Sequence, residues 1–140
     1  MNWTLLDKLS LVCWDWEGTL VEHGKLLLYA DELVRLFDSQ KIVQVVISNA
    51  NAQILQASCR QLNWPMRLVL GWGLNLELKP HPAMINYALS QLQLNKQEVI
   101  FFGDSATDMQ AAYLAGIQGY LIEDGLKAVY DYYFQLYGKK

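Results

Sequence analysis

An apolar run that ends in two carboxylates constrains this chain more than any other feature: residues 9–20 read LSLVCWDWEGTL. The residues before Asp15 are mostly apolar and β-prone, which is typical of a strand buried on both faces of a parallel sheet. Asp15 would then lie at the carboxyl end of the strand, at the edge where open α/β sheets bind ligands. Glu17 points the same way in an extended chain, and Gly18 permits a sharp turn. Taken alone, the stretch fits a solvated turn equally well.

The composition predicts one globular domain over residues 1–140, since 53% of the residues are hydrophobic and 18% are charged. With a net charge of −3 there is no basic field, so we expect neither nucleic acid nor a membrane as partner. Cys13 and Cys59 lack the spacing of a zinc site or a disulfide framework, which favours the reducing cytoplasm. The first residues do not read as a signal peptide.

Strand-like and helix-like segments alternate along the chain. Apolar periodicity predicts strands at 9–14, 41–49, 67–70, 98–102 and 117–122, and helices at 29–39, 51–62, 82–92, 105–116 and 126–137. This alternation predicts an α/β fold: a three-layer, Rossmann-like domain with a central parallel sheet of about five strands flanked by helices. Two short apolar pieces around Gly24 predict a small flap hairpin.

Several aromatic residues have two interpretations. The final predicted helix carries Tyr130, Tyr133, Phe134 and Tyr137 on one face, which is most simply core packing. Aromatic residues beyond that face would also suit a dimer surface. Trp72 is likewise most simply a core residue, and its alternative role is to line a substrate.

Polar residues gather where successive strands end. They are Asp15 and Glu17 after the first strand, Ser48 and Asn49 after the second, Asp104, Ser105 and Asp108 after the fourth, and Lys79 beside the same edge. Alone, Ser48 or Asp108 could be a helix cap and Lys79 a solvated surface charge. Together, the carboxylates repel one another unless a cation lies among them, and oxygen ligands select Mg²⁺. A hydroxyl, a lysine and loop amides hold phosphate oxygens, which favours phosphoryl chemistry.

Four motifs in this order resemble the haloacid dehalogenase (HAD) superfamily, on its phosphatase branch. The family's Asp-x-Asp-Gly-Thr is matched by residues 15–19 with one departure, and its strand ending in Ser or Thr by residues 47–49. Its Lys, usually followed by Pro, is matched by Lys79-Pro80, and its Gly-Asp-Ser-x-x-Asp pattern by residues 103–108. The motifs span nearly the whole chain.

The resemblance implies an Mg²⁺-dependent phosphatase that hydrolyses a phosphate monoester through an aspartyl-phosphate on Asp15. Glu17 would occupy the general acid/base position, and Lys79 would neutralise charge on the nucleophile and the phosphoryl group. The implied phosphate-binding residues are Ser48, Asn49, Lys79, Gly18 and Thr19, and the implied metal ligands are Asp15, Glu17 through its backbone carbonyl, Asp104 and Asp108. Asp108 would act through water or would orient Lys79.

Glu17 is the departure, since phosphatases of this family carry Asp there. The extra methylene displaces the carboxyl by roughly 1.5 Å, and a misplacement of about 1 Å can lower a rate on the order of 100-fold. Two hypotheses follow. Either Glu17 still serves as the acid/base, which we favour, or the chain is a weakened HAD-like protein that acts as a phospho-ligand binding or regulatory module.

We expect no cap domain, because predicted core elements fill the stretches between Asp15 and Ser48 and between Ser48 and Lys79. An open site suits a phosphorylated macromolecule, or a phosphorylated small molecule covered by a neighbouring subunit of a homo-oligomer. His23 and Lys25 in the flap, with Trp72, are the nearest candidates to line it; the alternative for His23 is a solvated turn residue. A response-regulator receiver is disfavoured, since its lysine comes last in the chain.

Overall fold

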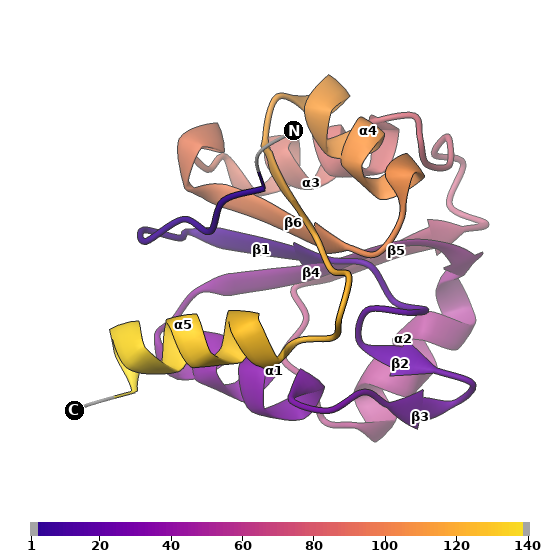
Figure 1. Cartoon of the computed structure of the whole chain (residues 1–140). Helices are drawn as coiled ribbons and strands as arrows, with labels where there is room; N and C mark the ends of the chain where they lie inside the picture. Colours follow the sequence, from indigo (N-terminus) through magenta and orange to yellow (C-terminus); the bar gives the residue numbers. More distant parts are fainter. Residues whose placement is uncertain (1–2, 139–140) are drawn as a thin grey trace.

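The computed structural model describes residues 3–138, and its centre is a five-stranded parallel sheet with the order β5-β4-β1-β6-β7. The strands are β1 Leu11–Trp14, β4 Val43–Asn51, β5 Leu68–Trp72, β6 Val99–Gly103 and β7 Gln118–Leu121. The helices are α1 Ala30–Ser39, α2 Ala52–Gln61, α3 Ala83–Leu92, α4 Ala106–Ala115 and α5 Lys127–Tyr137. Helices α3 and α4 cover one face of the sheet, and α1, α2 and α5 cover the other (Figure 1). The predicted three-layer α/β fold is confirmed.

Strand β1 lies at the middle of the sheet, paired with β4 on one side and β6 on the other. Its four residues are fully buried. Val12 and Trp14 face the core under α1 and α5, while Leu11 and Cys13 face the core under α3 and α4. Because both faces are covered, the strand is apolar throughout instead of alternating.

Helices α2 and α4 begin with side-chain caps. Ser105 and Asp108 form a reciprocal capping box at the start of α4, and Asn51 accepts a hydrogen bond from the Ile54 N–H at the start of α2. Such caps satisfy backbone donors that the first helical turn leaves unpaired. We expected Glu98 to begin the fourth strand. Instead it ends a short 3-10 helix, Lys96–Glu98, that precedes β6.

A small hairpin follows β1, as the sequence predicted. It consists of β2 Val21–Glu22 and β3 Lys25–Leu26 in antiparallel pairing, with Gly24 at φ 77° in the turn. Within residues 3–138, the chain between β1 and β4 forms this hairpin and α1, and α2 and β5 follow β4. No inserted cap domain lies among these described elements. Nor does any helix in residues 3–138 have the length and apolarity needed to cross a bilayer.

The core-packing interpretations of Trp72 and Phe134 are wrong. Strand β5 runs on through Trp72, whose side chain is 58% exposed at the end of an edge strand. On α5, only Val129 and Tyr133 are buried; Phe134 is turned outward and stacks on Tyr130. Only the narrow face with Val129 and Tyr133 packs into the core, and the other side of the helix is exposed.

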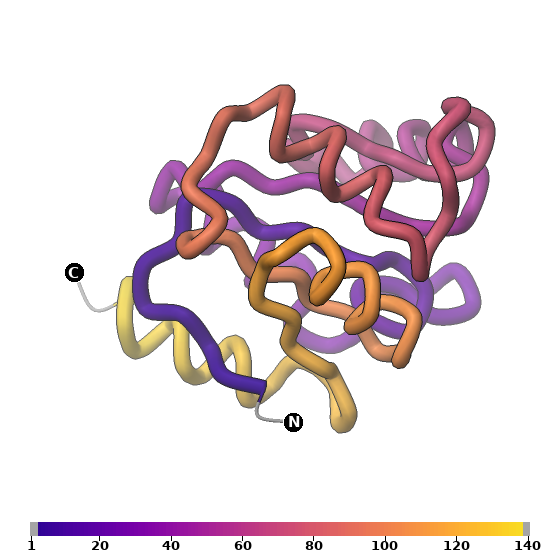
Figure 2. The backbone as a smooth tube through the Cα atoms, turned by 90° about the horizontal axis from the view of Figure 1, so that it is seen from above, coloured from indigo at the N-terminus to yellow at the C-terminus, as the bar shows by residue number. Residues whose placement is uncertain are grey.

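Helix α5 also holds the segment that precedes β1. The Tyr133 hydroxyl donates to the Leu6 carbonyl at 2.8 Å, and the Tyr137 hydroxyl donates to the Asp7 carbonyl at 2.9 Å. In the view from above, this N-terminal segment passes beside the helix (Figure 2). The tyrosines of the helix therefore bind a neighbouring segment of the same chain.

Candidate active site

The polar residues after β1 and β6 and in the last part of β4 meet in one depression of about 280 Å³ at the carboxyl edge of the sheet; β4 runs on to Asn51, so Ser48 and Asn49 lie within the strand and not after it. The residues that line the depression are Asp15, Glu17, Ser48, Asn49, Ala50, Lys79, Asp104, Ser105, Thr107 and Asp108. Of the residues that the sequence assigned to a site, Gly18 and Thr19 do not line the depression: Gly18 lines a neighbouring hollow, and Thr19 is fully buried. Parallel strands place their carboxyl ends at one edge, which is why residues so far apart in sequence converge.

Lys79 joins the elements of the depression. Its ammonium donates to Asp15 Oδ1 at 2.8 Å, to Asp108 Oδ1 at 2.5 Å and to the Ile47 carbonyl at 2.9 Å. The side chain is 4% exposed, so its interpretation as a solvated surface charge is wrong. A buried ammonium requires such partners, because desolvation of an unpaired charge is costly.

Burial of the Asp15 side chain disfavours the charged form of its carboxyl. Burial is the main cause that raises the pKa of its carboxyl to about 7; Lys79 opposes this shift and Asp108 adds to it. The Thr19 hydroxyl donates to Asp15 Oδ2 at 3.4 Å. Thr19 thus supports the carboxylate from behind, and binding of phosphate by Thr19 stays a prediction.

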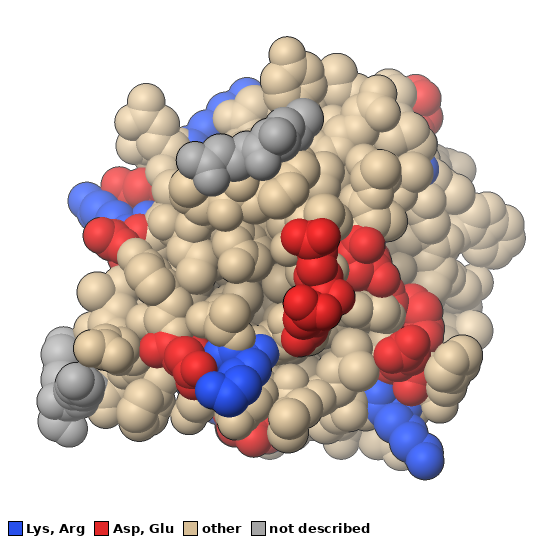
Figure 3. All heavy atoms as spheres, in the orientation of Figure 1, with Lys and Arg blue, Asp and Glu red and all other residues tan. Residues whose placement is uncertain are grey.

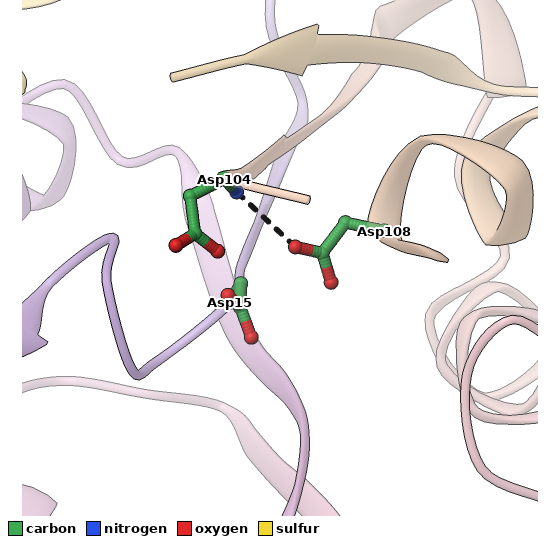
Figure 4. A group of neighbouring side chains, drawn as sticks. All are labelled: Asp15, Asp104 and Asp108. Carbon is green, nitrogen blue, oxygen red and sulfur yellow. Dashed lines mark hydrogen bonds between the residues drawn. The ribbon is translucent and has the colours of Figure 1, made fainter. Parts of the chain in front are cut away.

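Asp108 is fully occupied by protein donors. Its Oδ2 accepts from the Asp104 N–H at 3.1 Å, and from the N–H and the hydroxyl of Ser105 at 3.2 and 2.9 Å. The first of these bonds is drawn in Figure 4. Gly103 allows this close approach, since a Cβ there would lie 2.5 Å from Asp108 Cβ. Asp108 therefore fixes the loop after β6 and pairs with Lys79, while the two roles expected for it, binding metal through water and orienting Lys79, stay predictions.

Three carboxylates converge on the space beside this lysine. One oxygen each from Asp15, Asp104 and Asp108 lie within 4.8 Å of one another, and Figure 4 shows the side chains coming together from separate elements. One ammonium balances only part of three carboxylates, and clustered carboxylate oxygens are the ligands that Mg²⁺ prefers. The donor set therefore fits a divalent cation.

Gly18 makes room for Asp104. It adopts φ 81°, and a Cβ at this position would lie 2.0 Å from Asp104 Oδ2. Beside it, a hollow of about 510 Å³ is lined by Glu22, Asp104 and Glu123 among other residues. Acidic side chains gather on this face of the molecule (Figure 3). The role of Gly18 in this structure is steric, and phosphate binding by its loop stays a prediction.

Glu17 lines the depression but is turned toward the flap. Its Oε2 accepts a hydrogen bond from the His23 backbone N–H at 3.0 Å. Its carboxylate does not belong to the group of three, and a metal bond to its backbone carbonyl stays a prediction. The side chains of His23 and Lys25 are exposed, and neither they nor Trp72 line the depression.

Ser48 and Asn49 differ in what they offer. Ser48 Oγ accepts from the Ala50 N–H at 3.1 Å, which leaves its hydroxyl proton available to a phosphate oxygen. Both polar atoms of the Asn49 side chain bind the backbone of Lys79: Oδ1 accepts from the Lys79 N–H at 2.8 Å, and Nδ2 donates to the Lys79 carbonyl at 3.0 Å. These contacts favour a role in holding Lys79, while phosphate binding by Asn49 stays a prediction.

Sequence reasoning missed two lining residues. Thr107 lies at the mouth, with its hydroxyl 2.8 Å from that of Ser105, and Ala50 contributes backbone. Thr107 lies inside the motif that ends at Asp108, so its place between two site carboxylates was the available signal. Nothing in the sequence distinguishes Ala50.

The structure thus combines a three-layer α/β fold with an acidic cluster and a buried lysine at the carboxyl edge of the sheet. A sequence model of the haloacid dehalogenase-like hydrolases matches residues 12–122, and the chain belongs to that family. The match includes all four motifs.

Individual relatives are similar over different shares of the chain. A phosphoglycolate phosphatase of Photorhabdus laumondii is 47% identical over 49 residues, which are 35% of this chain and 21% of that protein. The matched part therefore spans about a fifth of that relative. A HAD-superfamily hydrolase of Ehrlichia chaffeensis superposes with a TM-score of 0.73 at 24% identity, over 87% of this chain and 63% of that one. A hydrolase of Streptococcus pneumoniae superposes with a TM-score of 0.78 at 14% identity, over 89% and 98%.

Proposed function

We propose that this chain is an Mg²⁺-dependent phosphatase that hydrolyses a phosphate monoester through an aspartyl-phosphate on Asp15. The observation that carries the proposal is the buried lysine that joins Asp15 to Asp108, with the Asp104 carboxylate beside them. Family membership and the phosphatase relatives add support. We place the activity in the cytoplasm and take the substrate to be a phosphorylated small molecule or macromolecule.

The carboxylates of Asp15 and Asp104 would hold the Mg²⁺, with Asp108 behind them. When bound, the ion supplies positive charge that offsets the negative charge of the phosphoryl oxygens. Lys79 contributes a second positive charge next to Asp15, and the Ser48 hydroxyl donates to a phosphoryl oxygen. These groups bring the carboxylate nucleophile and the phosphate together against their mutual repulsion.

Asp15 attacks phosphorus, and the bond from phosphorus to the ester oxygen breaks. Glu17 gives its proton to the departing oxygen, so the product leaves as an alcohol. The Glu17 carboxylate then takes a proton from water, and the water oxygen attacks phosphorus. The bond from phosphorus to the Asp15 oxygen breaks, which releases inorganic phosphate and regenerates the Asp15 carboxylate.

Hydrolysis of p-nitrophenyl phosphate with Mg²⁺ tests the proposal. We expect measurable turnover that EDTA abolishes and that Asp15→Asn lowers at least about 1,000-fold. Asp38→Asn, which changes an exposed carboxylate of α1, is the matched control and should leave turnover unchanged. Absence of turnover across a panel of phosphate esters would contradict the proposal.

The bond between Glu17 and the His23 N–H favours a second candidate function. A carboxylate held by the flap protonates a leaving group poorly, and the chain would then bind phosphorylated ligands or regulate a partner without rapid turnover. Glu17→Asp separates the two functions. A gain of about 100-fold in turnover would indicate a weakened enzyme, while equal or lower turnover would indicate that Glu17 already serves as acid/base.

A further inference from the structure

The open edge of the sheet carries a groove that the catalytic proposal does not use. Strand β5 pairs only with β4 among the described residues, so its other edge has no neighbouring strand. A groove of about 510 Å³ follows this edge and is lined by the consecutive residues 66–70. Helix α2 contributes Gln56, Cys59 and Arg60 to one wall, and Leu74, Leu76 and Tyr87 form the other. The groove therefore runs along a strand edge between two helical layers.

The edge has little of the usual protection against an added strand: one side-chain amide, that of Gln56, donates to the Val69 carbonyl at 3.3 Å. Natural edge strands often carry proline or charged residues that prevent pairing with another chain. Residues 68–72 read LVLGW and contain neither; the charged residue at this edge is Arg67, directly before them. Trp72 at its end is 58% exposed, and Leu74 and Tyr87 beside it are each 39% exposed. Exposed aromatic residues around a groove are typical of protein interfaces.

The charges of the groove are positive in a chain whose net charge is −3. Arg60 and Arg67 are its charged lining residues, and no carboxylate lines it. Both side chains are exposed, and neither guanidinium forms an ion pair with a carboxylate within residues 3–138. Arginine is the side chain best suited to bind carboxylates at an interface, through two parallel hydrogen bonds.

We propose that this groove binds an extended acidic peptide segment of a partner protein, which adds to the sheet as a strand beside β5. The backbone of the segment pairs with the outer edge of β5 and displaces the Gln56 amide from the Val69 carbonyl, and its carboxylates meet Arg60 and Arg67. A second copy of this chain is a poorer occupant, because edge-to-edge pairing would bring the arginines of both copies close together. A nucleic acid would require a wider basic field than two arginines provide. The proposal does not depend on catalysis.

Fluorescence anisotropy with a labelled Glu-Val repeat peptide of about eight residues tests the proposal. A peptide of this length can pair along all of β5, since an extended strand advances about 3.3 Å per residue. The matched Lys-Val peptide and a single-stranded oligonucleotide are the competing probes. We expect the acidic peptide alone to bind, and Arg60→Glu with Arg67→Glu to weaken it at least about tenfold. The doubly reversed protein should bind the Lys-Val peptide instead. Arg35→Glu on α1 is the control. Arg35 pairs with Asp31 and lies outside the groove, so this variant should bind the acidic peptide as the wild type does.

Hydrogen exchange adds a readout of strand addition. Binding of the acidic peptide should slow exchange of backbone amides in residues 68–72 while leaving phosphatase turnover unchanged. No binding at about 1 mM peptide, unchanged affinity in the doubly reversed protein, or no slowing at β5 would overturn the proposal. Preferential binding of the oligonucleotide, or a dimer in sedimentation that protects residues 68–72, would also overturn it by assigning the edge to another occupant.

Discussion

At the scale of single residues, Asn49 is the side chain whose contacts differ most from the role its motif implies. Its amide holds both the N–H and the carbonyl of Lys79. Lys79 in turn reaches Asp15 and Asp108 from that fixed backbone. Asn49 thus holds the backbone of the lysine from β4, the strand next to the one that leads to Asp15.

We expect Asn49→Ala to lower kcat by about 10–100-fold with little change in KM, because a displaced ammonium no longer meets the reacting groups. Steady-state kinetics with p-nitrophenyl phosphate measures both constants. Asn51→Ala is the matched control: it removes the cap of α2 and costs about 1 kcal/mol of stability, but it should leave kcat unchanged. Equal kcat in Asn49→Ala and the wild type would contradict the positioning role.

Lys79 shows what sequence reasoning reaches at this scale. Its place at the site follows from its position in the motif order, before Asp104. Its burial and its bond to the Ile47 carbonyl do not follow, because they depend on how the chain between β5 and α3 is laid across the sheet edge. Glu17 is similar: its contact with the flap depends on the path of a turn that the residue types leave open.

At the scale of elements, the loop after β1 and the loop after β6 are fitted to each other. Gly18 lies in the first and Asp104 in the second, and the missing side chain of one makes room for the carboxylate of the other. We expect Gly18→Ala to weaken Mg²⁺ binding at least about tenfold, because it displaces a proposed ligand. Isothermal titration with Mg²⁺ measures the affinity.

Gly24→Ala separates this effect from backbone strain. Gly24 has φ 77°, close to the 81° of Gly18, but a Cβ there would meet nothing within 4 Å. Both variants should lose about 1 kcal/mol of stability from the left-handed conformation. Only Gly18→Ala should lose Mg²⁺ affinity, and the same loss in Gly24→Ala would show that strain alone is responsible.

Elements were predictable where local chemistry decides them. The capping box of α4 and the hairpin around Gly24 depend on residues that are neighbours in the sequence, and the structure has both. Trp72 and Phe134 were misread because a strand edge and the outer side of a helix are defined by what lies beside them. Burial of a large aromatic residue is a property of the assembled layers, and residue type alone predicts it poorly.

At the scale of the whole molecule, burial of the Asp15 carboxylate lowers the stability of the fold at neutral pH. The raised pKa of Asp15, about 7 against the model-compound value of 3.8, comes chiefly from burial. Below pH 3.8 the Asp15 carboxyl is protonated in both the folded and the unfolded state, so its burial does not lower the free energy of unfolding. As the pH rises toward 7, the unfolded chain ionises first, so the folded state loses stability, and the loss is complete above about pH 7.

We therefore expect Asp15→Asn to stabilise the protein in EDTA at about pH 8, by about 1–2 kcal/mol, and to have a much smaller effect at about pH 4. Thermal unfolding at the two pH values measures the difference, with Asp38→Asn as the control that should show no such trend. Addition of Mg²⁺ at pH 8 should reverse the order, since an ion that binds only the folded state raises its stability, and the wild type has the complete ligand set. A wild type more stable than Asp15→Asn in EDTA at pH 8 would show that Lys79, and not burial, governs the energy of the Asp15 carboxylate.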